Sequence, residues 1–88
     1  TFEAPDFENF HGLSLAYQAG RLGGTMPTVF NAANERAVQK FLDRKIGYLT
    51  ITDMIAESME HHRVLDHPGV DEILAAEQET YEFIESRW

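Results

Sequence analysis

The stretch Gly23-Gly-Thr-Met-Pro-Thr-Val-Phe-Asn-Ala-Ala-Asn-Glu35 decides the fold, because it contains the end of one helix and the start of the next. The two glycines at its beginning suit the left-handed conformation that ends a helix. Thr25 can cap the following helix, and Pro27 is tolerated in a first turn, where its missing N–H group costs nothing. The pattern therefore predicts that one helix stops near Leu22 and another starts near Met26.

Similar signals on either side divide the chain into four expected helices, at about residues 11–22, 26–44, 51–63 and from 70 or 71 to the end. Short polar or glycine-containing connections separate them, and no segment shows the alternation of a strand. The sequence predicts an all-α fold, an up-and-down four-helix bundle. We expect residues 1–9 to be the extended end of a linker and residues 10–88 to be the domain.

The clearest start signal is Thr50-x-x-Asp53, which is typical of a capping box, with Leu49 and Met54 placed for a hydrophobic staple. Apolar spacing then predicts the buried sides of the last two helices, which are Ile51, Met54, Ile55 and Met59 in one and Val70, Ile73, Leu74, Tyr81, Ile84 and Trp88 in the other. The first helix is apolar on two sides, with Leu13, Ala16, Tyr17 and Gly20 on one and Leu15, Ala19 and Leu22 on the other.

The second helix also shows two contact surfaces. At about 100° per residue, an apolar arc predicted to be core holds Met26, Phe30, Ala33, Ala37 and Phe41. A neighbouring strip, called here the asparagine strip, consists of Asn31, Asn34, Glu35, Val38 and Leu42. Its amides can both donate to and accept from backbone groups, which suits contact with a neighbouring loop. The alternative is an exposed helix flank, and the remaining side, with Arg36, Gln39, Lys40 and Asp43, is expected to be solvated.

Composition excludes several classes of partner and site. The 88 residues carry a formal net charge of −8, which argues against nucleic acid or an anionic membrane as partner. There is no cysteine, so disulfides and thiolate metal sites are excluded. No apolar run approaches the ~20 residues needed to span a bilayer, and the cytoplasm is the expected compartment.

Candidate chemistry within the chain is weak. His61, His62 and His67 with Asp66 have the residue types of a metal site, but histidines near a helix end also complement the helix dipole, and we favour a structural or surface role. The glycines near residue 23 lack the context of a phosphate loop, and the acidic residues of the last helix lack the spacing of a calcium loop. We therefore assign no catalytic, cofactor-binding or metal-binding residue.

Three runs connect the sequence to a known family: Leu13-Ser-Leu-Ala-Tyr-Gln-Ala-Gly20, Gly23-Gly-Thr-Met-Pro27 and above all Phe30-Asn-Ala-Ala-Asn-Glu35. They resemble the C-terminal helical domain of 1-deoxy-D-xylulose 5-phosphate reductoisomerase, and the likeness extends over essentially all 88 residues. One departure is His11-Gly12, where the family usually has Pro-Cys before the Leu-x-Leu-Ala run. This difference changes a helix start and leaves the identification of the family intact.

The resemblance implies a parent enzyme that rearranges 1-deoxy-D-xylulose 5-phosphate and reduces it with NADPH to 2-C-methyl-D-erythritol 4-phosphate, assisted by Mn²⁺, Mg²⁺ or Co²⁺. It implies that these groups bind upstream, that the enzyme is a homodimer, and that the asparagine strip contacts the catalytic domain. We expect residues 1–88 alone to be inactive. The alternative is a free-standing acidic helical module that binds a basic protein.

A helical domain with two apolar sides on its first helix is also expected to self-associate when it is isolated. The expected surface joins Leu15, Ala19 and Leu22 to Val38 and Leu42. Such a patch would exceed the few hundred Å² that soluble monomers usually expose. A two-fold contact that strengthens with salt would cover it.

Overall fold

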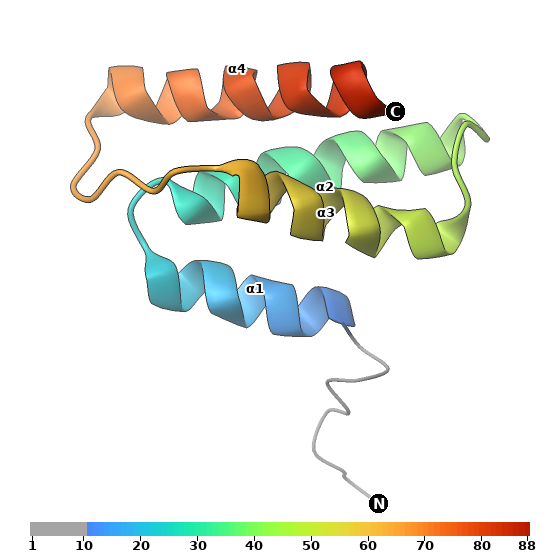
Figure 1. Ribbon diagram of the computed structural model, residues 1–88, viewed down its shortest axis with the longest axis horizontal. Coiled ribbons are helices and arrows are strands. Elements are labelled where there is room, and N and C mark those ends of the chain that lie inside the picture. Colours follow the sequence, from blue (N-terminus) through green and yellow to red (C-terminus); the bar gives the residue numbers. More distant parts are fainter. Residues whose placement is uncertain (1–10) are drawn as a thin grey trace, which may run out of the picture.

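The computed structural model describes residues 11–88, so the expected linker at residues 1–9 lies outside the described part. Four helices form: α1 (His11–Leu22), α2 (Met26–Leu42), α3 (Tyr48–His61) and α4 (Val70–Arg87). No strand is present among residues 11–88. The predicted all-α fold is confirmed, and successive helices run in alternating directions (Figure 1).

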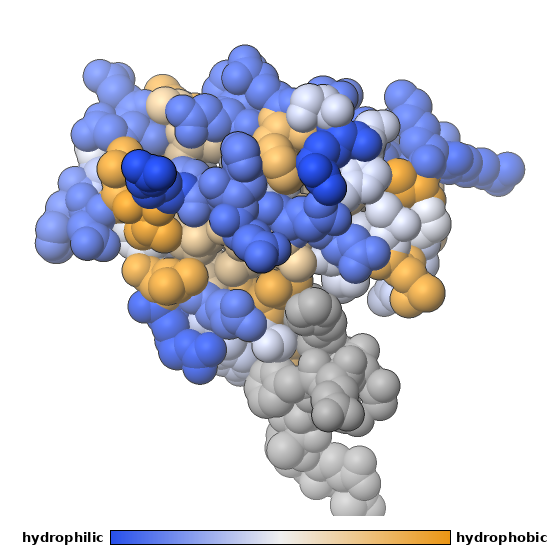
Figure 2. Space-filling view, viewed as in Figure 1, coloured by the Kyte–Doolittle hydropathy of each residue, from blue (hydrophilic) through white to orange (hydrophobic). Residues whose placement is uncertain are grey.

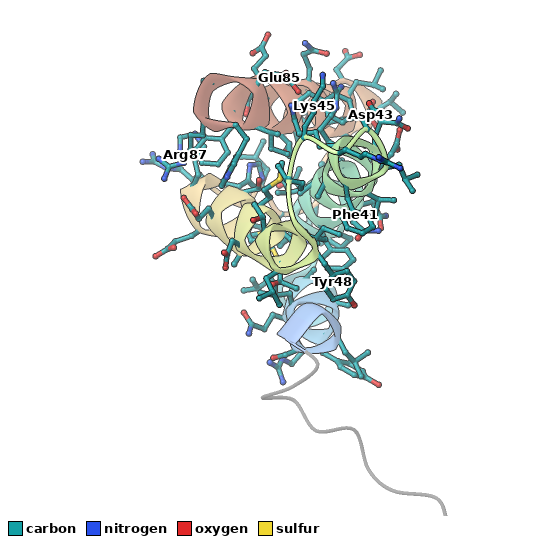
Figure 3. All side chains as sticks on the ribbon, turned by 90° about the vertical axis from the view of Figure 1, so that its right-hand side faces the viewer. Phe41, Asp43, Lys45, Tyr48, Glu85 and Arg87 are labelled. Atoms are coloured by element: carbon teal, nitrogen blue, oxygen red, sulfur yellow. The ribbon has the colours of Figure 1, made fainter. Side chains whose placement is uncertain are left out.

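The helices are arranged around a central pair. Viewed along the bundle, α2 and α3 lie side by side, with α4 on one side of the pair and α1 on the other (Figure 3). Both outer helices contact both central ones, but within the described residues α1 and α4 do not touch each other. The cross-section is therefore rhombic, and α2 is the helix most closely connected to the rest of the domain.

The turn between α1 and α2 has the predicted conformation. Gly23 and Gly24 have φ angles of 64° and 54°, and the Gly23 N–H donates to the Ala19 carbonyl at 3.0 Å. A Cβ atom on Gly24 would lie 2.2 Å from the Leu65 carbonyl oxygen, so only glycine fits there. Thr25 does stand at the N-cap position, but its side chain makes no cap hydrogen bond and bonds to the loop before α4 instead.

The predicted capping box of the third helix is wrong. α3 begins at Tyr48, three residues before the predicted start, and Gly47 is its N-cap with extended backbone. Thr50 therefore lies inside the first turn, where its N–H donates to the Gly47 carbonyl at 3.1 Å. Gly47 has no side chain that could cap the helix, although glycine is common at this position. α2 and α3 each end two residues earlier than predicted.

The core combines small residues of α2 with larger side chains of the other helices. α3 has the predicted orientation, since Met54, Ile55 and Met59 are buried and Ile51 packs beside them. The buried cluster consists of Leu15, Ala19, Met26, Val29, Ala33, Ala37, Met54, Ile55, Met59, Ala76 and Ile84. Alanines on α2 allow the neighbouring helices to approach closely, which places α2 at the centre.

α4 is rotated relative to its predicted orientation. Ile84 is buried as expected, but Val70 is 73% exposed and Leu74 is also exposed. The row that packs against the central pair is Ala76, Thr80 and Ile84, at a spacing of four residues. Small residues in this row let α4 settle on α2, and the apolar residues in its first turns lie beyond the contact.

The surface predicted for self-association is also different in the structure. Leu15 and Ala19 are buried, because that side of α1 packs against α2 and α3. Leu13 and Tyr17, which lie on the other side, are exposed, as is Leu22. Two of the three α1 residues of the expected patch are therefore already covered, and Leu22, Val38 and Leu42 remain exposed. In Figure 2, apolar residues form several separate patches on an otherwise hydrophilic face.

Candidate functional site

All five residues of the asparagine strip lie on one exposed face of α2. Asn31, Asn34 and Glu35 are exposed along the first half of the helix, and Val38 and Leu42 continue the face toward its end. Leu42 is 66% exposed. The buried residues of the same helix, such as Val29 and Ala33, lie on the opposite side. The exposed surface of these five residues is therefore available to a partner.

The side of α2 predicted to be solvated is partly covered by α4. Lys40 is only 7% exposed, and its ammonium group lies 3.2 Å from the Glu85 carboxylate. Arg36 pairs with the same carboxylate at 3.4 Å and stacks on the Tyr81 ring at 4.4 Å. This prediction is wrong for Lys40 because the aliphatic part of lysine can be buried while its charged end meets an acidic residue. Gln39 and Asp43 are exposed, as expected.

The asparagine strip continues into a group of exposed apolar residues where α2 is joined to α3. Phe41, predicted to be core, is 36% exposed and meets the Tyr48 ring edge to face at a centroid distance of 5.9 Å. Both rings lie on the same side of the bundle in Figure 3. Leu49 is exposed beside them in sequence. Exposed amide and carboxylate groups of the strip therefore lie next to exposed apolar side chains at this end of α2, a mixture that is common in protein–protein contact surfaces.

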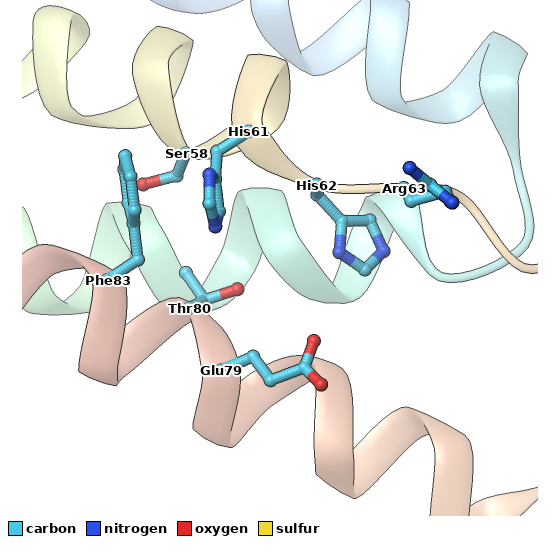
Figure 4. A pocket seen from close by; sticks show the side chains of 7 residues that line it. All are labelled: Ser58, His61, His62, Arg63, Glu79, Thr80 and Phe83. Atoms are coloured by element: carbon cyan, nitrogen blue, oxygen red, sulfur yellow. The ribbon is translucent and has the colours of Figure 1, made fainter.

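A small hollow of about 180 Å³ lies between the end of α3 and the middle of α4 (Figure 4). It is lined by Ser58, His61, His62, Arg63, Glu79, Thr80 and Phe83. Ser58 and Thr80 donate their hydroxyl hydrogens to the helix carbonyls of Met54 and Ala76 at 2.7 and 2.8 Å. Because those hydrogens are already committed, neither hydroxyl is paired with a base as a nucleophile would be.

The histidines that sequence analysis singled out have structural roles. His61 stacks on Phe83 with ring centroids 4.2 Å apart. His62 Nε2 lies 2.7 Å from the Thr25 hydroxyl, and His67 occupies a left-handed position with a φ of 52°. Burial lowers the pKa of His62 below its ordinary value of 6.5; the Glu79 carboxylate opposes this effect, and His61 adds to it. His62 therefore joins the loop after α3 to the turn before α2.

The described residues do not fit a metal ion or a dinucleotide. Among the side chains that the structure describes, residues 13–88, no group of three or more histidine, aspartate or glutamate residues is arranged to hold a metal. The hollow is also smaller than the roughly 300–1,000 Å³ of typical ligand pockets. None of the four helices is long and apolar enough to cross a membrane.

Comparison with known proteins supplies the family. The model of the DXP reductoisomerase C-terminal domain matches residues 1–83. The chain belongs to this family. It is 56% identical over all 88 residues to 1-deoxy-D-xylulose 5-phosphate reductoisomerase of Agathobacter rectalis and spans 23% of that relative. It is 58% identical over 85 residues to the reductoisomerase of Lachnoclostridium phytofermentans, matching 97% of this chain and 22% of that one.

A solved reductoisomerase has the same domain fold. The structure of the enzyme of Zymomonas mobilis in complex with NADPH matches with a TM-score of 0.88 at 37% identity. The match covers 98% of this chain and 23% of that one. This domain of the reductoisomerase family therefore spans less than a quarter of the relatives it resembles, and the resemblance read from the sequence is confirmed.

The contacts that join distant parts of the domain could not be predicted from local sequence patterns. The Thr25–His62 pair is separated by 37 residues, and the Lys40–Glu85 pair by 45. No local spacing rule connects residues so far apart. The one available signal was the position of Thr25 between two glycines and a proline, which marked it as a special site without naming its partner.

Proposed function

We propose that this chain is the C-terminal structural domain of a 1-deoxy-D-xylulose 5-phosphate reductoisomerase, with residues 10–88 as the domain and residues 1–9 as the end of the preceding linker. The parent enzyme converts 1-deoxy-D-xylulose 5-phosphate to 2-C-methyl-D-erythritol 4-phosphate with NADPH, a step of isoprenoid biosynthesis by the non-mevalonate pathway. The supporting observation is 56% identity over the full length of this chain to a reductoisomerase.

In this proposal the binding of NADPH and of Mn²⁺, Mg²⁺ or Co²⁺ belongs to the rest of the enzyme. The side chains of the described residues offer no suitable ligand set for the metal. The parent enzyme is a cytoplasmic homodimer, and the domain acts by holding the catalytic domain in its working geometry. Such support matters because catalytic groups must be held within about 0.5 Å of their productive positions.

The asparagine strip is the surface that contacts the catalytic domain. Its five residues lie together on an exposed face of α2, on the side away from the core. Two asparagine amides can each donate and accept hydrogen bonds with loop backbone, and Val38 and Leu42 supply apolar area beside them. This gathering of amide and apolar groups on one exposed face is the observation that carries the proposal. The alternative of a free-standing acidic module rests on the net charge alone.

The double substitution Asn31→Leu and Asn34→Leu tests this role. Both residues are exposed, so the melting temperature of the 88-residue chain should change by less than about 2 °C. Turnover by the full-length enzyme should fall about tenfold or more, because small misplacements of catalytic groups are costly.

The matched control is Gln78→Leu on the outer side of α4, an equally exposed amide that should leave turnover unchanged. Full activity of the double variant would contradict the proposed contact. A double variant whose isolated domain melts far earlier would place the two asparagines in an internal network instead.

A further inference from the structure

The end of α2 has an unusual residue in a strained position. The Arg44 N–H donates to the Phe41 carbonyl at 3.0 Å, and the Lys45 N–H donates to the Lys40 carbonyl at 2.8 Å. This pair of bonds is the Schellman motif, whose left-handed residue is usually glycine. Here that residue is arginine, with a φ of 61°. A side chain that is kept where glycine would be less strained points to a use for that side chain.

The two cations at this turn, Arg44 and Lys45, are not needed to pair the acidic residues of the neighbouring helices. Arg36 and Lys40 pair with Glu85, and Arg87 pairs with Glu57. Arg44 and Lys45 are exposed, and neither takes part in an ion pair among the described residues. Asp43, the residue before them, is an exposed carboxylate that accepts a hydrogen bond from Gln39, so residues 43–45 together carry a net positive charge in a chain whose net charge is −8. An acidic surface is the partner that such a site attracts.

Large exposed apolar side chains lie on both sides of the two cations in the sequence. Leu42, Tyr48 and Leu49 are 66%, 72% and 80% exposed. The Phe41–Tyr48 ring contact fixes two of the side chains against each other, which lowers the entropy that binding would cost. The name tip is used here for Phe41, Leu42, Arg44, Lys45, Tyr48 and Leu49. Leu42 belongs to both the tip and the asparagine strip, so the two surfaces are continuous.

We propose that the tip docks on an acidic and apolar surface of the reductoisomerase chain outside residues 1–88. This inference rests on the proposed function and extends the contact beyond α2. The chain spans 23% of its relative in Agathobacter rectalis, so most of such an enzyme lies outside the domain and is available to cover the tip. A second copy of the domain would bring like charges together if its tip met this one, and a contact with another of its surfaces would be head-to-tail and form rings or open chains.

Hydroxyl-radical footprinting tests the docking directly, because the oxidation rate of a side chain reports its exposure. Tyr48 and Leu49 should be oxidised roughly threefold or more slowly in the full-length enzyme than in the 88-residue chain, as expected for apolar residues buried at an interface core. The charge reversal Arg44→Glu with Lys45→Glu should restore fast oxidation in the enzyme. Equal rates in the enzyme and the isolated chain would overturn the proposal.

The variant Arg44→Gly separates docking from folding. It removes the cation and relieves the left-handed strain, so the isolated chain should melt at an unchanged or higher temperature. In the full-length enzyme, oxidation of Tyr48 should increase about twofold or more, in line with the loss of one exposed ion pair at the edge of an interface. The matched control is His67→Gly, which relieves the same type of strain at a residue with a φ of 52° in the α3–α4 connection. It should leave the tip protected.

The other outcomes each contradict a specific part of the proposal. Protection that appears in the 88-residue chain as its concentration rises would identify a second copy as the occupant. If Tyr48 stays protected from oxidation in the enzyme both with Arg44→Glu and Lys45→Glu and with Arg44→Gly, the surface that covers the tip is not acidic. Protection of Val38 without protection of Tyr48 would overturn this inference and leave the proposed function standing, whereas loss of both would contradict the proposed function.

Discussion

Thr25 joins the two connections that meet at one end of the domain. Its N–H donates to the Leu65 carbonyl at 3.1 Å, and its hydroxyl oxygen accepts from the Leu65 N–H at 3.0 Å. The same hydroxyl lies 2.7 Å from His62 Nε2, and Thr25 is fully buried. Neutral histidine has one donor and one acceptor nitrogen, so either partner of this bond can be the donor, depending on the tautomer. One side chain therefore fixes the start of α2 against the loop that leads to α4.

The close approach at Gly24 gives a prediction at the residue scale. Gly24→Ala should destabilise the domain by about 2 kcal/mol or more, or roughly 10 °C in melting temperature, because an alanine there is both left-handed and in collision with backbone. Gly23→Ala is the control, since its Cβ would meet nothing within 4 Å and the left-handed conformation alone would cost about 1 kcal/mol. Thermal unfolding of the two variants measures the difference, and equal losses would show that the contact with Leu65 is unimportant.

His62 makes the stability of the domain depend on pH. Its pKa in the folded domain is lowered below 6.5, mainly by burial, so the unfolded chain binds the proton more readily than the folded one. The stabilisation is complete above pH 6.5 and is lost as the pH falls below that value toward the lower folded pKa. Protonated His62 carries hydrogens on both nitrogens, so its Nε2 can then only donate to the Thr25 hydroxyl.

The variant His62→Gln should therefore be less stable than the natural chain at pH 7.5 and lose less stability than the natural chain does on acidification to pH 5.5. Melting temperatures of both proteins across this range measure the effect. The variant keeps Glu79 and His61, the charged neighbours that also act on this site. A constant difference between the two proteins at every pH would show that His62 does not titrate in this window.

At the scale of helices, the sequence predicted where elements lie better than how they are rotated. Helix punctuation placed α1 and the start of α2 correctly, because Gly23 and Gly24 require left-handed backbone and so act locally. For α2, apolar periodicity alone predicted that Phe41 is buried and that Lys40 is exposed, whereas Phe41 is exposed and Lys40 is buried. The true orientation depends on α4, which brings Glu85 to Lys40 from 45 residues away. A single wheel diagram contains no information about such a neighbour.

The candidate site shows the same division between local and long-range information. The family was recognisable from residues 30–35, and the asparagine strip was correctly predicted to be away from the core. The tip could not be predicted, because Arg44 occupies a left-handed position where sequence rules place glycine. The α3 start was misread for a related reason, since Gly47 caps the helix without the side chain that a capping box supplies.

Glu85 gives a prediction at the element scale, because it holds α4 against α2. Glu85→Gln would leave the ammonium of Lys40, which is 7% exposed, without its ionic partner. We expect a loss of about 1–2 kcal/mol, between the values for exposed and buried pairs. The control Glu82→Gln alters an exposed carboxylate that only accepts a hydrogen bond from Gln78. Denaturant unfolding measures the stability of the Glu85→Gln and Glu82→Gln variants. The double variant Lys40→Met with Glu85→Gln should recover much of the loss. A Glu85→Gln variant as stable as Glu82→Gln would contradict this account.

At the scale of the whole molecule, the rhombic arrangement leaves the domain with surfaces but without a deep cavity. α2 contacts all three other helices and still presents the asparagine strip outward. The hollow beside α3 and α4 is small and lined by hydroxyls already bonded to helix carbonyls. Both observations agree with the proposed role, in which the domain supports a larger enzyme through contact.

The 88-residue chain should accordingly bind no NADPH and reduce no substrate. A Rossmann dinucleotide site needs a glycine-rich turn between a strand and a helix, and residues 11–88 contain no strand. Titration calorimetry with NADPH should give no heat of binding at millimolar ligand. Micromolar affinity would show that part of the cofactor site lies in this domain.

The structure of the full-length enzyme tests the central claim most directly, through the exposure of the asparagine strip. Leu42, 66% exposed in the isolated domain, should be buried there. The amides of Asn31 and Asn34 should lie at about 3 Å from backbone groups outside residues 1–88. A full-length structure in which Leu42 remains exposed and both amides face solvent would contradict the account.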